Sequence, residues 1–80
     1  MMTMTYERVR RWLEEHGYRP DVDGSYEIVG PDIVLALEWQ DLPEGPGWGY
    51  WLTYVDGHQE SGSLDSISEL RGLIELIMGR

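Results

Sequence analysis

Histidine and cysteine, the side chains most often used in catalysis and zinc binding, are scarce or absent, and no common catalytic motif surrounds them. His16 and His58 are the only histidines, and there is no cysteine. Thiolate zinc sites, disulfides and cysteine nucleophiles are therefore excluded together, and a zinc site would need both histidines plus carboxylates. Serines occur at positions 61, 63, 66 and 68, but no nucleophile elbow surrounds them. We therefore expect no catalytic, metal-binding or cofactor-binding residues, and a protein that is not an enzyme.

Two short segments look like ligand-binding loops but differ from them in context. The stretch EGPGWGYWLTYVDG, Glu44 to Gly57, has alternating glycines, whereas a phosphate loop needs a strand before it and a helix N-terminus after it. Here a loop with two prolines precedes, and a strand follows. The segment DVDG, Asp21 to Gly24, lacks the glycine position and the third acidic ligand of a calcium loop. We interpret the first segment as a strand with its turns and the second as a turn.

Hydrophobic periodicity predicts one helix near each end of the chain. The first covers Thr5 to His16, with Thr5 as its cap and Gly17 as a left-handed stop. The second begins with Ser66 and Glu69, which fit a capping box. Its apolar face is formed by Ile67, Leu70, Ile74 and Ile77 and is widened by Leu73 and Leu76.

Four β-rich segments lie between these helices. They are Tyr26–Val29, Ile33–Trp39, Trp48–Val55 and His58–Leu64, the last of which is polar and expected at an edge. Pro43 and Pro46 predict a loop over Gln40–Gly47, and Asp56-Gly57 predicts a two-residue hairpin turn with positive φ at both residues. The expected fold is α+β, a single domain over residues 1–80. It is a four-stranded antiparallel sheet with two helices packed on one face, in the order α-β-β-β-β-α.

Strand alternation separates the aromatic residues of the third strand into two sets. Trp48, Tyr50, Leu52 and Tyr54 share one face, and Trp51, Thr53 and Val55 share the other. One set must meet the helices, so at least one large aromatic ring is expected on the open face, near carboxylates. Such a ring suits a protein partner that presents arginine, through ion pairs and cation–π contacts.

The net charge of −9 is unevenly distributed. Residues 1–19 sum to +1 and residues 71–80 to +1, whereas residues 20–70 sum to −11 and contain no Arg or Lys. A segment this anionic repels nucleic acid and acidic membrane surfaces, and it attracts basic protein surfaces. Solubility alone is the simpler explanation of the charge; the functional interpretation is an anionic surface that docks on a cationic partner.

In size, cysteine-free composition and charge layout, with the anionic centre EGPGWGYWLTYVDGHQE, Glu44 to Glu60, the chain resembles the small phage-encoded inhibitors called anti-CRISPR proteins. Several of those proteins place carboxylates where a target expects DNA phosphates. The resemblance implies a non-catalytic DNA mimic that acts in the host cytosol and blocks the nucleic-acid-binding surface of a CRISPR effector complex. The residues expected to contact the partner are Asp32, Glu38, Asp41, Glu44, Asp56 and Glu60, with Trp48 and Trp51 as apolar anchors.

Two other functions fit the same charge pattern. One is an antitoxin-like or immunity-like protein that neutralises a basic partner, and the other is a small structural subunit. The absence of a signal-peptide core and of any membrane-length apolar run predicts a soluble cytoplasmic protein. We expect a monomer or a weak homodimer, the latter through apolar residues of the last helix that exceed what a small core can bury, namely Leu73, Leu76 and Met78.

Overall fold

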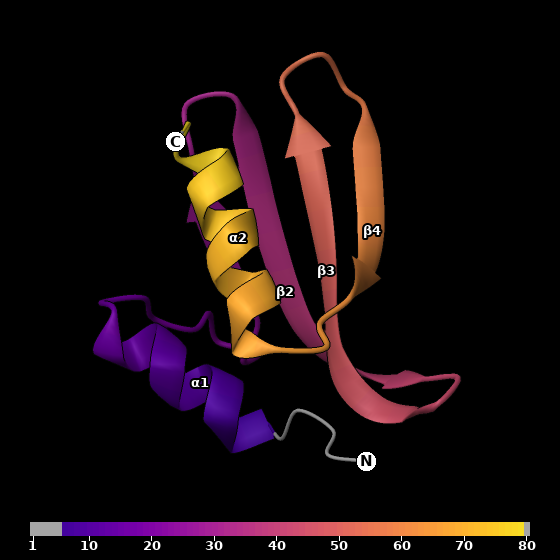
Figure 1. Cartoon of the computed structure of the whole chain (residues 1–80). Helices are drawn as coiled ribbons and strands as arrows, with labels where there is room; N and C mark the ends of the chain where they lie inside the picture. The colour runs from indigo at the N-terminus through magenta and orange to yellow at the C-terminus, as the bar shows by residue number, and fades with distance from the viewer. Residues whose placement is uncertain (1–5, 80) are drawn as a thin grey trace.

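The computed structural model describes residues 6–79 and has two layers, a sheet and a pair of helices (Figure 1). The elements are α1 (Tyr6–Glu15), β1 (Tyr26–Val29), β2 (Ile33–Leu42), β3 (Gly45–Tyr54), β4 (Gln59–Ser63) and α2 (Ile67–Ile77). The strands form one antiparallel sheet in the order β1-β2-β3-β4, and both helices contribute to a single core on one face of it. The predicted α+β fold and its element order are therefore confirmed.

The first helix is amphipathic and ends at the predicted glycine. Val9 and Leu13, one turn apart, are completely buried against the sheet. Gly17 has a φ of 89°, and the Tyr18 N–H donates to the carbonyl of Leu13 at 2.9 Å, which satisfies a carbonyl of the last turn. The predicted Thr5 cap lies outside the described residues.

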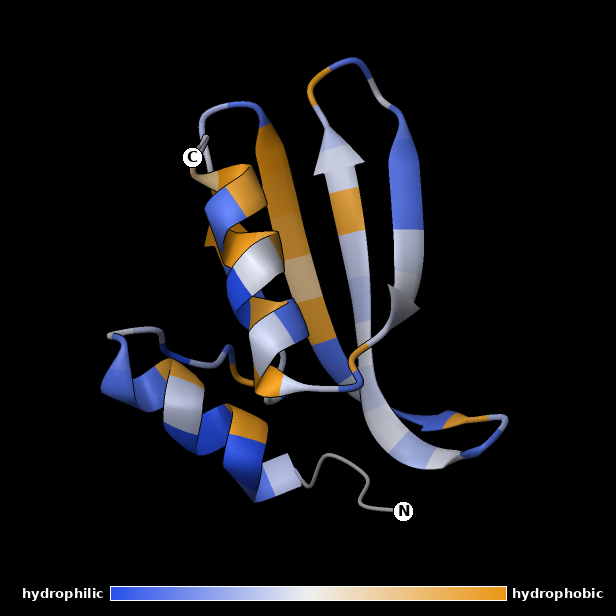
Figure 2. Cartoon of the chain, viewed as in Figure 1, coloured by the Kyte–Doolittle hydropathy of each residue, from blue (hydrophilic) through white to orange (hydrophobic). Residues whose placement is uncertain are grey.

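The central strand β2 is the most apolar strand, and alternate residues of it are buried in the core (Figure 2). Leu35 and Leu37 are completely buried, and they lie opposite Leu52 and Tyr50 of β3. Because residues directly opposite one another share a face, this pairing assigns the Trp48–Tyr50–Leu52–Tyr54 set to the helix-covered side.

Aromatic rings fill the core where α1 meets the sheet. Trp48 is completely buried, and Tyr6 stacks on it with ring centroids 5.4 Å apart and an interplanar angle of 7°. Trp39 meets Trp48 edge-on at 5.8 Å, and Tyr26 lies 6.0 Å away. Within the described part of the chain, neither the Tyr26 hydroxyl nor the Trp48 Nε1 has a hydrogen-bond partner. Burial, more than the nearby Glu14, raises the pKa of Tyr26.

The loop predicted over Gln40–Gly47 is wrong, because both strands continue through it. β2 ends at Leu42 and β3 begins at Gly45, so the turn consists of two residues. β1 pairs only with residues 34–37 of β2, and β4 only with residues 49–53 of β3. Residues 40–47 therefore form a two-stranded ribbon, here called the hairpin arm, which projects from the sheet (Figure 1).

Pro46 lies within β3, opposite Asp41, and its position explains why the strand tolerates it. The Trp48 carbonyl accepts a hydrogen bond from the Leu64 N–H on the β4 side. Pro46 is two residues earlier, so its ring nitrogen faces that same side. Because β4 reaches only as far as Gly49, there is no strand at that point to receive an N–H.

The hairpin between β3 and β4 forms, but not with the predicted two-residue turn. No described residue other than glycine has a positive φ, so Asp56 does not adopt it, whereas Gly57 does, with a φ of 93°. The Gly57 N–H donates to the Tyr54 carbonyl at 2.9 Å, and the Tyr54 N–H donates to the His58 carbonyl at 2.8 Å. This is a three-residue loop with a left-handed glycine. Val55, predicted as the last residue of the strand, lies in this loop and is exposed.

The second helix begins as predicted and crosses β2 (Figure 1). The Glu69 N–H donates to Ser66 Oγ at 3.1 Å, which satisfies one free N–H of the first turn. The Glu69 carboxylate accepts from the Asp65 N–H at 2.8 Å, one residue before the position of a standard capping box. Leu70 and Ile77 are buried in the core.

Candidate partner-binding surface

The helices pack on one face of the sheet and leave the other face, here called the open face, uncovered. Strand register and alternation assign the following residues to it: Glu27, Val29, Val34, Ala36, Glu38, Gln40, Gly49, Trp51, Thr53, Gln59, Ser61 and Ser63. Trp51 is the only aromatic residue among them. It lies in the middle of the face, between Ala36 on β2 and Ser61 on β4. The prediction of a large aromatic on the open face is confirmed.

Two side chains meet over Gly49, and a third is hydrogen-bonded to one of them. A Cβ added to Gly49 would lie 3.4 Å from Cη2 of the Trp51 indole and 3.0 Å from Oε1 of Gln40. Gln40 Nε2 donates to Glu38 Oε1 at 2.8 Å, and Glu38 lies directly opposite Gly49. The absence of a side chain at Gly49 thus lets the indole and the Gln40 amide meet over one point of the backbone, and the amide in turn binds the carboxylate of Glu38.

The sequence analysis identified Trp51 and Glu38 but missed Gln40. The two prolines that follow Gln40 predict a loop there, and a loop has no defined face. Extending the period-two alternation of β2 by one residue past Trp39 would have placed Gln40 beside Glu38, on the face of Ala36 and Trp51.

The open face is acidic. Glu27 and Glu38 are exposed on it, and no residue from 20 to 70 is Arg or Lys. Glu27 lies in the same row as Trp51, separated from it by Ala36. The indole therefore has two carboxylates on its β1–β2 side and no cation among residues 20–70, an environment that suits a ring receiving a cation.

The other predicted contact residues do not join this group. Asp32 and Asp56 lie at one end of the sheet, where the Val55 N–H donates to the Asp32 carbonyl at 2.9 Å. Asp41 and Glu44 lie at the opposite end, on the hairpin arm. The carboxylates are thus spread over the two ends of the sheet as well as its open face.

Trp48 is the predicted contact residue that the structure excludes from the surface. Its side chain is completely buried beneath Tyr6, and a partner cannot reach it without unfolding this part of the core. The physical reason is the alternation that separates it from Trp51: Trp48 shares a face with Leu52, which lies opposite Leu35, and that face meets the helices.

Glu60 lies on the helix-covered side of the edge strand, in a small polar cluster with Tyr54 and His58. Its carboxylate accepts from the Tyr54 hydroxyl at 3.3 Å and lies 3.2 Å from His58 Nε2. The pKa of Tyr54 is raised mainly by loss of hydration and to a smaller extent by the charge of Glu60. The side chains of His58 and Glu60 are 57% and 54% exposed, so the pair lacks the dry cleft in which acid–base catalysts operate.

The DVDG segment forms a turn, as predicted. The Gly24 N–H donates to the Asp21 carbonyl at 2.9 Å, and Gly24 has a φ of 85°. Asp23 Oδ1 accepts from the Ser25 hydroxyl at 2.7 Å and from the Ser25 N–H at 3.0 Å. These bonds lower the pKa of Asp23, the hydroxyl contributing most.

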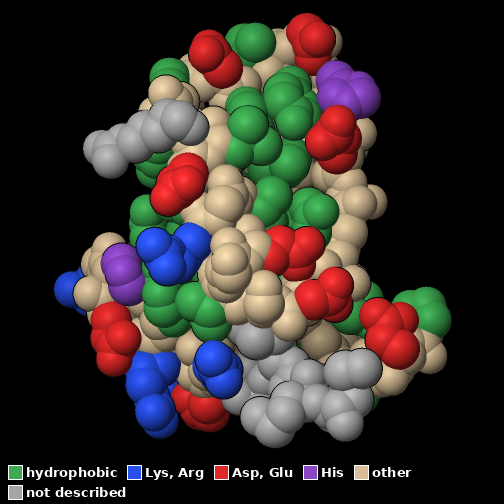
Figure 3. All heavy atoms as spheres, in the orientation of Figure 1, with side chains coloured by type: hydrophobic (Ala, Val, Ile, Leu, Met, Phe, Trp, Pro, Cys, Tyr) green, Lys and Arg blue, Asp and Glu red, His purple; other side chains and the backbone are tan. Residues whose placement is uncertain are grey.

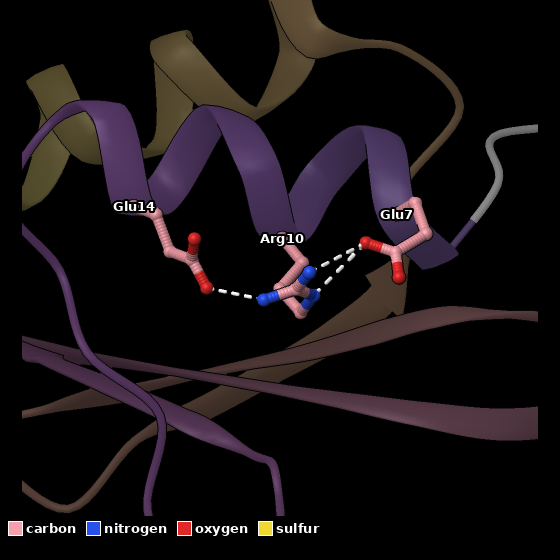
Figure 4. A network of polar contacts seen from close by, with 3 residues as sticks. All are labelled: Glu7, Arg10 and Glu14. Carbon is pink, nitrogen blue, oxygen red and sulfur yellow. Dashed lines mark hydrogen bonds and ion pairs between the residues drawn. The ribbon is translucent and has the colours of Figure 1, made fainter.

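The basic side chains gather away from the sheet. On the helix-covered face, Arg side chains lie around α1 and the adjoining end of α2, and acidic ones extend to the hairpin loops (Figure 3). Arg10 donates to Glu7 Oε1 through Nε at 3.0 Å and through Nη2 at 2.7 Å, and it also pairs with Glu14 (Figure 4). The bond to Glu7 and the charge of Glu14 raise the pKa of Arg10. Its charge is therefore matched within α1 and does not reach the acids of the sheet.

Comparisons of the chain with protein-family models, with curated proteins and with solved structures found no match. Within residues 6–79, no group of three or more His, Asp or Glu side chains is placed to hold a metal ion. Neither described helix has the length and apolar character needed to cross a membrane.

Proposed function

We propose that this chain is a non-catalytic acidic binding protein that occupies a cationic, nucleic-acid-binding surface of a partner protein, in the manner of the anti-CRISPR inhibitors that it resembles. The observation that carries the proposal is the separation of charge in three dimensions. The described arginines are at positions 8, 10, 11, 19 and 71, on the helices and the connection after α1. The sheet and its hairpin loops carry carboxylates without a single cation.

A surface of this kind favours a basic protein over every polyanion. Carboxylates at both ends of the sheet and on its open face repel phosphate groups, so direct binding of DNA or RNA is disfavoured. The same carboxylates attract a groove lined with Lys and Arg and speed the encounter with it. An occupant held in that groove excludes nucleic acid by competition, and no chemical step is needed.

The proposal is tested by competition with DNA. A panel of purified CRISPR effector complexes is mixed with labelled target DNA, and the protein is titrated in. We expect at least one complex to lose DNA as the protein is added, because both ligands occupy the same cationic surface. DNA binding that is unchanged in every complex at saturating protein would contradict the proposed function.

Charge variants test whether carboxylates cause the competition. The combination Glu44→Gln, Asp56→Asn and Glu60→Gln removes one charge each from the hairpin arm, the β3–β4 loop and β4. A matched control, Glu15→Gln, Asp65→Asn and Glu75→Gln, removes the same charge from exposed positions on or beside the helices. We expect the first variant to compete at least about tenfold less well and the control to change little. Equal effects of the two would show that net charge alone is responsible and would count against a defined acidic surface.

A further inference from the structure

We propose that the open face binds an arginine side chain of the cationic partner, with the guanidinium stacked on Trp51 and paired with Glu38. This inference rests on the proposed function and specifies the point of contact. The proposed site consists of the half-exposed indole of Trp51, the carboxylate of Glu38 and the Gln40 amide that positions this carboxylate.

The residues beside Trp51 in its row are small and leave the indole half-exposed. Trp51 is flanked in its row by Ala36 and Ser61, and its ring edge lies over Gly49, which has no side chain. None of these neighbours is large enough to cover the ring. A guanidinium placed over a tryptophan face within about 6 Å of the ring centre gains about twofold to fivefold in affinity at an exposed site.

The carboxylate is held in place before a ligand arrives. Glu38 would otherwise rotate freely, because its side chain is exposed. The 2.8 Å bond from Gln40 Nε2 to Glu38 Oε1 restrains it beside the same glycine that Trp51 covers. An acceptor already oriented loses less conformational entropy when it pairs with a cation.

The geometry selects arginine over lysine. A guanidinium is flat, so it stacks on an indole and at the same time donates two N–H groups to a carboxylate. An ammonium is a point charge with a stronger hydration shell and does not satisfy both groups so well. A surface that acted through charge alone would not distinguish the two.

Other occupants fit the open face less well. An apolar surface would take Glu27 and Glu38 out of water without a counter-charge, which is costly. A second copy of this chain packed face to face would place these carboxylates close to their own equivalents, with no cation on either face. Charge complementarity therefore favours a basic protein.

The test uses two synthetic peptides of equal charge, nona-arginine and nona-lysine, with the whole protein at low salt. Binding is measured by calorimetry, and the indole N–H signal of Trp51 is followed by ¹H–¹⁵N NMR. We expect nona-arginine to bind about twofold to fivefold more tightly and to shift the Trp51 signal more than those of the other three tryptophans. Trp51→Leu should abolish the preference.

A second pair of variants keeps the test independent of any folding defect in Trp51→Leu. Glu38→Gln preserves the shape of the side chain and should weaken nona-arginine binding by a larger factor than Glu75→Gln, which removes the same charge from an exposed position on α2. Circular dichroism confirms that each variant is folded.

The outcomes separate this inference from the proposed function. Equal binding of the two peptides, with an unshifted Trp51 signal and no effect of Trp51→Leu, would overturn the inference and leave the acidic binding surface intact. Binding of neither peptide at low salt would contradict both. Self-association through the open face, seen as loss of the Trp51 signal on raising the protein concentration alone, would also overturn the inference.

Discussion

The carbonyl oxygen of Ile77, at the end of α2, lies directly against Gly30, in the turn between β1 and β2. A Cβ added to Gly30 would be 1.9 Å from that oxygen and 2.7 Å from the carbonyl carbon. Both atoms belong to the backbone, so no rotation of a side chain can relieve the contact. Gly30 therefore allows the C-terminal end of α2 to rest on the sheet, where Ile77 is buried in the core.

Replacing Gly30 by alanine should destabilise the protein. The end of α2 must move away from the β1–β2 turn, and we expect a loss of about 1–3 kcal/mol in the free energy of unfolding, the cost typical of overpacking. Urea denaturation measures it. Gly72→Ala is the control, because it lies within α2 with no atom within 4 Å of the added Cβ. It should stabilise by about 0.5–1 kcal/mol, and equal effects of the two substitutions would refute this account of Gly30.

Removing the buried hydroxyl of Tyr26 should cost little at neutral pH. Because that hydroxyl has no hydrogen-bond partner among the described residues, Tyr26→Phe should leave the free energy of unfolding unchanged or raise it by up to about 1 kcal/mol. A loss of more than about 1 kcal/mol would mean that the hydroxyl is satisfied in solution.

Ionisation of Tyr26 should lower the free energy of unfolding at alkaline pH. Its pKa is raised in the folded protein, so the unfolded chain ionises first, at the ordinary value of about 10. The contribution is thus fully present below pH about 10 and is lost as the pH rises through the folded pKa. The chain has no Lys or Cys, and the other groups expected to titrate in this range are chiefly the four remaining tyrosines, which Tyr26→Phe leaves in place. Denaturation between pH about 8 and 11 should show a smaller alkaline loss in Tyr26→Phe than in the unmodified protein; an identical loss would exclude Tyr26 as a cause.

The two tryptophans of β3 should differ in their effect on stability. Trp48 fills the aromatic core, so Trp48→Ala should cost about 3–5 kcal/mol, enough to unfold much of a small domain. Trp51→Leu, on the open face, should change stability by less than about 1 kcal/mol. Chemical denaturation followed by far-ultraviolet circular dichroism distinguishes the two, and similar losses would contradict the assignment of Trp51 to the surface.

The sequence predicted the elements well where periodicity is strong. The alternation of β2, the apolar stripe of α2 and the glycine after α1 each specify local structure by themselves. It failed at Pro46, which lies within β3, because a proline blocks a strand only on the side where its nitrogen should donate. Whether a neighbouring strand occupies that side of β3 at the proline depends on how far β4 extends along β3, which local sequence does not determine.

The candidate site was only half predictable for a similar reason. Alternation separates Trp48 from Trp51, but the choice of which one is buried follows from the partner strand, where Leu35 and Leu37 share the face of Trp48. The meeting of Trp51 and Gln40 over Gly49, with Glu38 directly opposite that glycine, arises from the register between two strands. No spacing within either strand reveals it.

The salt dependence of partner binding tests the central claim most directly, that an acidic surface docks on a cationic one. For an effector complex that loses DNA to this protein, the dissociation constant is measured from about 0.05 to 0.5 M NaCl, over which the Debye length falls several-fold. We predict that affinity falls by about tenfold or more across that range, and that the Glu44→Gln, Asp56→Asn, Glu60→Gln variant shows a shallower dependence. Tight binding that is indifferent to salt would contradict the account.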